Sequence, residues 1–295
     1  MTNDDEIVQE IWATRVCWSR TADRLKKRVD TARAAALILS GLGAIATTMT
    51  ATLLSSAGVA RTIVGIVGAV CLACATITAA HFLTPTAVRD WTRARAGSEG
   101  IKRAVYEFRA SAGSGIAELR GSVTEIHTAA ADLLPEFVQT AVVVEAAPRA
   151  LTPEEYISDR VQAQIDSYYR PMARASAVRS RRLRRVGFAL GLLGTIVAAV
   201  ASVVPGSGAT ALAPWVAALT TLSGGVAAHL VAKRYDYMII TYLATASRLQ
   251  RLVEDWRLGA AADWHGFVRS CEDVIATENN GWISKWSEPE GAQGR

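Results

Sequence analysis

The stretch RSRRLRRVGFALGLLGTIVAAVASVVPGSGATALAPWVAALTTLSGGVAAHLVAKR, residues 179–234, decides the fold of this protein. After its arginine-rich start, an uncharged apolar run covers residues 186–204, and a second run covers residues 211–232. A Pro-Gly-Ser-Gly turn that begins at Pro205 separates the two runs. Each run has about twenty residues, which is roughly the length that a helix needs to cross a ~30 Å hydrocarbon core. The stretch therefore predicts a transmembrane helical hairpin.

A second hairpin is predicted nearer the N-terminus, from apolar runs at about residues 34–54 and 62–83. The average composition conceals both hairpins, since the 295-residue chain is 51% hydrophobic and has a mean hydropathy of +0.20. Arginine and lysine cluster beside the outer ends of the hairpins, whereas the first turn carries only Arg61 and the second turn has no charge. By the positive-inside rule, this asymmetry predicts four spans with both chain termini in the cytoplasm.

Each hairpin is followed by large apolar side chains at helical spacing. Steps of three and four residues predict long cytoplasmic helices whose apolar seams pack in a bundle or against a second copy. We therefore expect an all-α membrane protein with a cytoplasmic helical bundle that assembles as a homo-oligomer. The seam residues are Trp91, Ile101, Val105 and Phe108 after the first hairpin, and Tyr235, Ile239, Tyr242, Leu249, Val253 and Trp256 after the second.

An internal repeat relates the two halves of the chain. A shift of 148 residues places the AAH that ends at His81 on the AAH that ends at His229, and also superposes the two seams. The hairpins are therefore interpreted as diverged copies of one module in parallel orientation. The second copy begins with a capping box at Thr152 to Glu155, with proline at the first helical position. The predicted domains are a first module at 1–115, a linker with a short helix at 116–150, a second module at 151–288 and a disordered tail at 289–295.

Hydroxyl groups in the first hairpin are the candidates for a pore lining. Thr48, Thr52 and Ser55 share one helical face, and Thr76 lies on the returning span. Such hydroxyls can also bond to the carbonyl of the preceding turn and need no pore to explain them. Any water path is expected along the first hairpin, with the second as a packing scaffold. His81 and His229 are either polar anchors at the membrane interface or titratable rings at a pore mouth.

Arginine and glycine residues suggest two further roles. The block of Arg179, Arg181, Arg182, Arg184 and Arg185 is expected to contact anionic lipid, and bidentate arginine contacts to an anionic ligand are the alternative. Small residues let helices approach closely, so tight packing within or between subunits is expected at the span glycines. The candidates are Gly65, Gly68, Gly187, Gly191 and Gly194.

Motifs of enzyme chemistry are missing from the sequence. It contains no phosphate-binding glycine loop with a following lysine, no HExxH and no clustered Cys/His ligand set. We therefore expect no enzymatic activity, no catalytic residue, no metal and no cofactor. The net charge of +5 comes from the arginine blocks beside the spans, so the lipid bilayer is the expected partner, and nucleic acid is not.

The second half resembles the SLATT domains, two-span helical modules of bacterial conflict systems. The resemblance rests on PEEYISDRVQAQIDSYYRPMARAS (153–176), the arginine block, the short-turn hairpin and RYDYMIITYLATASRLQRLVEDW (234–256). The first half, including IWATRVCWSRTADRL (11–25), looks like a more divergent SLATT type in the tandem arrangement of DUF4231-like proteins.

The resemblance implies a membrane effector in the bacterial inner membrane that forms a pore or ion channel in antiviral signalling. It also implies activation by a nucleotide second messenger or a signalling protein. We expect the cytoplasmic helices to transmit that signal to the spans through Thr84-Pro85 and through residues 232–235. The alternative function is a non-conducting membrane scaffold that recruits partners through its helical bundle.

Overall fold

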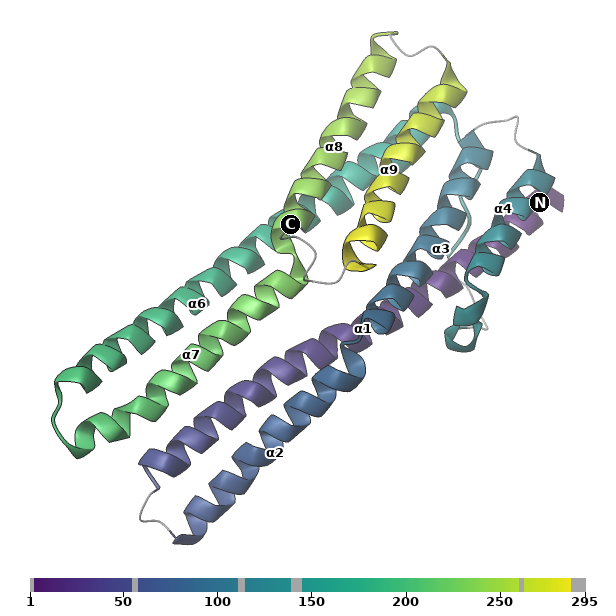
Figure 1. Cartoon of the computed structure of the whole chain (residues 1–295). Coiled ribbons are helices and arrows are strands. Elements are labelled where there is room, and N and C mark those ends of the chain that lie inside the picture. The colour runs from purple at the N-terminus through teal and green to yellow at the C-terminus, as the bar shows by residue number, and fades with distance from the viewer. Residues whose placement is uncertain (1–2, 55–57, 111–114, 139–144, 260–262, 288–295) are drawn as a thin grey trace. The chain divides into compact units, whose positions relative to one another are not determined.

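A computed structural model describes residues 3–54, 58–110, 115–138, 145–259 and 263–287 of the chain. Its elements are helical, and the described residues contain no strand (Figure 1). In chain order they are α1 (Asn3–Thr52), α2 (Gly58–Phe82), α3 (Pro85–Ala110), α4 (Ile116–Ala129), the 3-10 helix η1 (Ala131–Glu136), α5 (Pro153–Glu155), the π-helices η2 (Tyr156–Gln162) and η3 (Gln164–Tyr169), α6 (Arg170–Val203), α7 (Ser207–Lys233), α8 (Tyr235–Arg257) and α9 (Trp264–Ser287).

The chain forms two compact units, and both predicted modules contribute to each of them. One unit, here called the membrane unit, consists of Arg28–Thr84 and Ala175–Met238. The other, called the polar unit, consists of Met1–Lys27, Pro85–Arg174 and Ile239–Arg295. The helices α1 and α6 contribute residues to both units without a break. The compact units therefore do not follow the modules of the repeat, whose boundaries stay a prediction.

Four helices of the membrane unit pack in the order α2, α1, α7, α6 (Figure 1). Glycines mark each neighbouring pair: Gly43 of α1 faces Leu72 of α2, Gly41 of α1 faces Leu222 of α7, and Gly187 of α6 faces Val226 of α7. The four apolar runs that the sequence predicts as spans lie in these helices, each long and apolar enough to cross a membrane. The prediction of an all-α membrane protein with two hairpins is confirmed.

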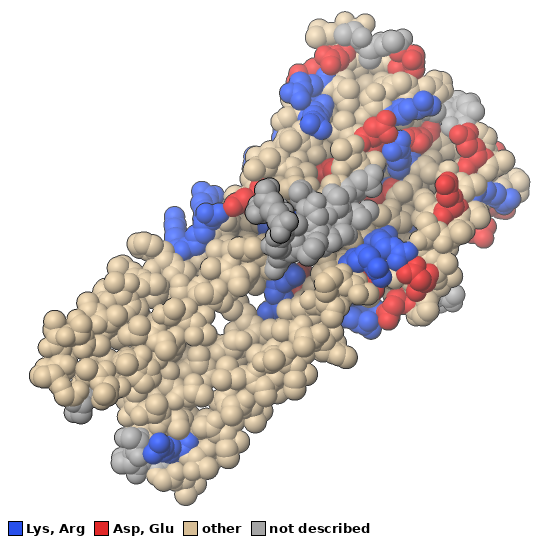
Figure 2. All heavy atoms as spheres, in the orientation of Figure 1, with Lys and Arg blue, Asp and Glu red and all other residues tan. Residues whose placement is uncertain are grey.

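The outward surface of the membrane unit is apolar. Phe188 is 73% exposed and Val203 is 77% exposed, and exposed isoleucine, leucine and valine continue along all four helices. On the face shown in Figure 2, Lys, Arg, Asp and Glu are nearly missing from most of this unit. An exposed apolar surface of this extent is matched to lipid and not to water.

The polar unit has an ordinary buried core, in which α3 packs against both α4 and α9. Large side chains of the first module, such as Trp18 and Ile101, are fully buried, and so are Ile165 and Leu249 of the second. The predicted capping box is present: the Thr152 hydroxyl accepts from the Glu155 amide, and the Glu155 carboxylate accepts from the Thr152 amide. This cap starts the helical run that becomes α6.

Helix breaks lie at similar places in the two halves. After α2 ends at Phe82, Pro85 starts α3 because proline is favoured in the first turn of a helix. After α7 ends, Arg234 adopts a left-handed conformation with φ of 48°, and α8 begins at the next residue. Both breaks fall where the sequence predicted that a signal passes between the spans and the long helices. The predicted tail at 289–295 lies outside the described residues.

Candidate functional site

A groove of about 400 Å³ opens between α1, α2 and α7 in the membrane unit. Thr47 and Thr221 are exposed along it, whereas Thr48 is buried and donates a hydrogen bond of 3.3 Å to the carbonyl of Pro214. The Thr47 and Thr221 hydroxyls each donate to a carbonyl of their own helix. A hydroxyl that donates its proton keeps acceptor lone pairs, so these oxygens can receive hydrogen bonds from water or contact a cation. The full lining is Ala44, Thr47, Thr48, Leu72, Pro214, Ala217, Ala218 and Thr221.

The predicted pore-facing residues differ in their relation to this groove. Thr48 lines it. Thr52 is half-buried and donates to the Thr48 carbonyl at 2.8 Å, and Thr76 is exposed and donates to the Leu72 carbonyl at 3.0 Å. Ser55 lies outside the described residues. The part that these residues play in a pore stays a prediction.

The second hairpin contributes to the groove, although the sequence pointed to the first. Pro214 and Thr221 both come from α7. The adjacent hydroxyls Thr220 and Thr221 in an apolar run were the signal that could have placed them there. The groove therefore combines the hydroxyl face of the first hairpin with a proline carbonyl and a hydroxyl of the second.

The predicted packing glycines lie at close contacts within one chain. A Cβ atom on Gly68 would be 3.2 Å from the Thr47 amide nitrogen, and one on Gly65 would be 3.4 Å from Thr50. The contacts of Gly187, Gly191 and Gly194 are looser, at 3.5 to 3.7 Å from α7 side chains. The Gly-xxx-Gly pattern of α6 thus faces its own hairpin partner.

Gly43 of α1 makes a tighter contact between helices than any of the predicted packing glycines, and replacing it with alanine should destabilise the hairpin. A Cβ atom there would lie 2.6 Å from Leu72 Cγ and 3.1 Å from the Gly68 carbonyl oxygen. Overpacking of this kind costs about 1–3 kcal/mol. Thermal unfolding of the full chain in detergent should show a lower melting temperature for Gly43→Ala. Gly224→Ala is the matched control because its added Cβ would meet nothing within 4 Å; equal melting temperatures for the two variants would contradict the packing.

The two histidines of the repeat lie in different surroundings. His81 is exposed at the end of α2, with its ring at 5.0 Å from that of Phe82. His229 is half-buried, and its Nδ1 atom has no hydrogen-bond partner among the described residues. The Lys233 ammonium, which pairs with Asp30 at 2.5 Å, is one of the charges that act on His229. The roles of both rings stay predictions.

The five arginines of the predicted lipid-binding block are exposed on α6. Arg184 pairs with Asp236 at 2.5 Å. The exposed apolar side chains Val186 and Phe188 follow directly on the same helix. A change from exposed arginine to exposed apolar residues within one turn is typical of a helix that enters a membrane at the headgroup level. The block comprises Arg179, Arg181, Arg182, Arg184 and Arg185.

The predicted seams are covered within a single chain. In the polar unit, Trp91, Ile101, Val105, Tyr242, Leu249 and Val253 are buried, and Phe108, Ile239 and Trp256 are half-buried. Tyr235, in the membrane unit, is also buried. Because these side chains already have apolar neighbours, they supply no argument for a second copy of the chain. An oligomer would have to use other surfaces.

A second stripe of α3 carries charge into the interior of the polar unit. Arg95, Glu99, Lys102 and Tyr106 follow one another at helical spacing, and Arg95 pairs with Glu99 at 2.8 Å. Burial, together with repulsion from Arg160, lowers the pKa of Lys102 to about 8. The helical spacing of this stripe is visible in the sequence. Only the apolar seam beside it on the same helix was nevertheless identified from the sequence.

A deeply buried ion pair of the polar unit joins η2 to α9. The Arg160 guanidinium makes two hydrogen bonds of 2.7 and 2.8 Å to the Glu272 carboxylate, and both side chains are at most 2% exposed. The Tyr156 hydroxyl donates to the same carboxylate at 3.0 Å, and burial raises the pKa of Tyr156 well above its usual value. Arg160 also stacks 4.3 Å from the centre of the Tyr106 ring. A buried ion pair of this kind often contributes no more stability than well-packed apolar residues would, whereas the loss of one partner alone is strongly destabilising.

Metal binding finds no support in the part of the chain that the structure describes. No group of three or more His, Cys, Asp or Glu side chains is placed there to hold an ion.

These features define a class: an all-α membrane protein built from two helical hairpins and an extramembrane helical unit. Residues 156–282 match the family model described as SMODS and SLOG-associating 2TM effector domain 1, or SLATT_1. Residues 16–114 match the model of a family described as a protein of unknown function, DUF4231. No curated protein and no solved structure matches the chain.

The chain belongs to the SLATT-domain family, as the resemblance of its sequence predicted. It is accordingly a membrane-associated effector of a conflict system. Each family match contains one hairpin, which agrees with the tandem repeat.

Proposed function

We propose that this protein is a homo-oligomeric pore or ion channel of the bacterial inner membrane, with both termini in the cytoplasm, that acts in antiviral conflict signalling. The observation that carries the proposal is a groove with three threonines in its lining, which opens between helices whose outward surface is mostly apolar. Polar groups inside a membrane protein are expensive and commonly mark a path for water or ions. An open groove of this kind becomes a closed path when copies of the chain assemble around it.

Gating is assigned to the polar unit. The helices α1 and α6 contribute residues to both units, so they are the segments along which a change in the polar unit reaches the membrane unit. The breaks at Thr84-Pro85 and at Arg234 allow α2 and α7 to adjust. A signal that repacks the polar unit would then change the width of the groove.

Conductance in planar bilayers tests this proposal through the charge of the groove. Thr47 is exposed along the groove, so Thr47→Asp adds a negative charge to the proposed path without a buried carboxylate. The ratio of cation to anion permeability should rise severalfold, because a negative charge in a narrow path attracts cations and repels anions. Thr221→Asp should have the same effect from the opposite hairpin.

The matched control is Thr195→Asp on α6, an exposed threonine whose hydroxyl likewise donates to its own helix. Thr195→Asp makes the same chemical change at a residue that does not line the groove. This variant should leave the ratio of cation to anion permeability unchanged. If the folded, assembled protein carries no current in any state, the pore proposal fails and the scaffold alternative replaces it. If Thr195→Asp shifts selectivity as much as Thr47→Asp, the groove is not the path.

A further inference from the structure

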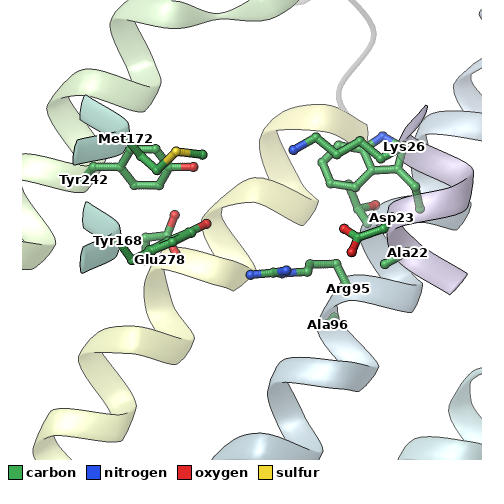
Figure 3. Close-up of a pocket in the computed structure, with 11 residues that line it drawn as sticks. Ala22, Asp23, Lys26, Arg95, Ala96, Tyr168, Met172, Tyr242 and Glu278 are labelled. Carbon is green, nitrogen blue, oxygen red and sulfur yellow. The ribbon is translucent and has the colours of Figure 1, made fainter. Parts of the chain in front are cut away.

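The polar unit contains a pocket of about 210 Å³ that neither the groove nor the family assignment explains. Helices of both modules line it: α1, α3, α8, α9 and the segment where η3 meets α6 (Figure 3). Pockets for drug-sized ligands begin at about 300 Å³, so this one is suited to a single ring system with a small substituent. A ligand bound here would contact both modules at once.

Aromatic rings supply the walls of the pocket. Trp91 is 8% exposed and Tyr242 is 2% exposed, and both line it. The rings of Tyr168 and Tyr242 meet edge to face, with their centres 5.8 Å apart and an angle of 66° between their planes. An aromatic ring whose face borders the pocket binds a flat aromatic ligand by stacking.

Two side chains of opposite charge, the buried Glu278 and the partly exposed Arg95, line the pocket between its aromatic walls. The Glu278 side chain is 5% exposed, and in Figure 3 it lies beside Tyr168 on one side of the pocket, with Arg95 reaching toward it from the other. The Arg95 guanidinium is held by Glu99 at 2.8 Å. A carboxylate accepts hydrogen bonds from N–H groups, whereas a guanidinium donates to oxygen and ring nitrogen. A ligand that bonds to both the Glu278 carboxylate and the Arg95 guanidinium must carry donors on one edge and acceptors on the adjacent edge.

Exposed charges lie at the mouth. Asp23 and Lys26 are both exposed on α1, and the Lys26 ammonium lies 5.6 Å from the centre of the Trp91 ring. Lysine binds phosphate as a mobile point charge. A ring bound against the aromatic walls can therefore place an anionic substituent beside Lys26.

We propose that this pocket binds the guanine base of a mononucleotide. Guanine carries adjacent N–H donors on its N1 and N2 atoms, which the Glu278 carboxylate accepts, and the acceptors O6 and N7, to which Arg95 donates. Adenine has no such pair of adjacent donors, so it forms fewer hydrogen bonds with the Glu278 carboxylate than guanine does. The phosphate of the nucleotide is placed at Lys26. The pocket holds one base, and a dinucleotide exceeds its volume.

Calorimetric titration of the full chain in lipid nanodiscs with GMP, AMP and inorganic phosphate tests the assignment. GMP should bind at least about tenfold more tightly than AMP, and phosphate alone should bind weakly. Glu278→Gln should weaken GMP binding at least about tenfold, since the amide replaces an acceptor with a donor. Arg95→Lys should also weaken it, since lysine lacks the fork that contacts two acceptors. Asp273→Asn is the matched control, because it makes the same carboxylate-to-amide change on α9 at an exposed pair with Arg103.

Equal binding of GMP and AMP would overturn the base assignment. Binding of inorganic phosphate as tight as that of GMP would also overturn it, because only the charges at the mouth of the pocket would then contribute to binding. Circular dichroism establishes that the variants are folded; if they are not, the comparison of GMP with AMP on the unaltered chain still decides. Regulation by this site rests on the proposed pore function and is measured separately. GMP binding without any current would support the binding site and rule out the pore. Current without GMP binding would support the pore and rule out the binding site.

Discussion

Replacing Glu272 with alanine should destabilise the full chain by about 3–5 kcal/mol, because it leaves the Arg160 guanidinium charged and unpaired in the protein interior. Arg160 is 2% exposed and makes two of its hydrogen bonds to this carboxylate. The Tyr156 hydroxyl loses its acceptor at the same time. Thermal unfolding in detergent, followed by circular dichroism, should show a melting temperature lower by roughly ten degrees.

The control for this variant lies one residue further along α9. Asp273 pairs with Arg103 at 2.6 Å, but its side chain is 55% exposed. Exposed ion pairs contribute about 0–1 kcal/mol, so Asp273→Ala should change the melting temperature little. The double variant Arg160→Met/Glu272→Leu removes both charges and should recover most of the loss. A fall that persists in the double variant would mean that packing, and not the unpaired charge, causes the effect.

The membrane unit was largely predictable because its signal is local. Apolar runs of about twenty residues, interrupted by charged flanks, are sufficient to identify spans. The structure places all four of them in long helices. The capping box at Thr152 was equally visible, since its two hydrogen bonds join residues three apart. The repeat was readable because both copies retain the same seam.

The groove was only half predictable. Thr48 was identified from its helical face, but its partner carbonyl at Pro214 is 166 residues away. No sequence pattern states that α1 packs against α7, because that neighbourhood depends on how the two hairpins dock. Single-chain periodicity can assign a polar face to one helix, and it cannot say which other helix completes the lining.

The buried ion pair of Arg160 and Glu272 was missed for a related reason. Arg160 and Glu272 are 112 residues apart and belong to η2 and α9. Each reads in the sequence as an ordinary surface charge on an amphipathic helix. Only the packing of η2 and α9 in the polar unit turns them into a buried pair. For the seam residues, the sequence predicted burial but left the packing partner open. A periodic apolar face does not tell whether that partner is the same chain or another copy.

Lys102 provides the converse of the Glu272 prediction, because removing its charge should stabilise the protein. At pH 7 the ammonium is protonated in both folded and unfolded chains, and the folded state bears the cost of its burial and of its repulsion from Arg160. The pKa falls from 10.5 in its ordinary state to about 8 in the folded chain. This difference corresponds to a cost of about 3 kcal/mol below pH 8. Lys102→Met keeps a similar apolar stem and should therefore raise the melting temperature at pH 7.

The sign of the pH dependence separates this effect from simple repacking. Between about pH 8 and 10.5 the unfolded chain binds more protons at Lys102 than the folded chain does, so the stability of the unaltered protein rises with pH through this window. The advantage of Lys102→Met should accordingly shrink from pH 8 upward and nearly vanish near pH 10.5. Melting temperatures of both chains at pH 7 and pH 9.5 measure it, with Lys27→Met as the control at an exposed lysine. A gain of the same size at both pH values would show that methionine packs better, and that the buried charge of Lys102 carries no cost.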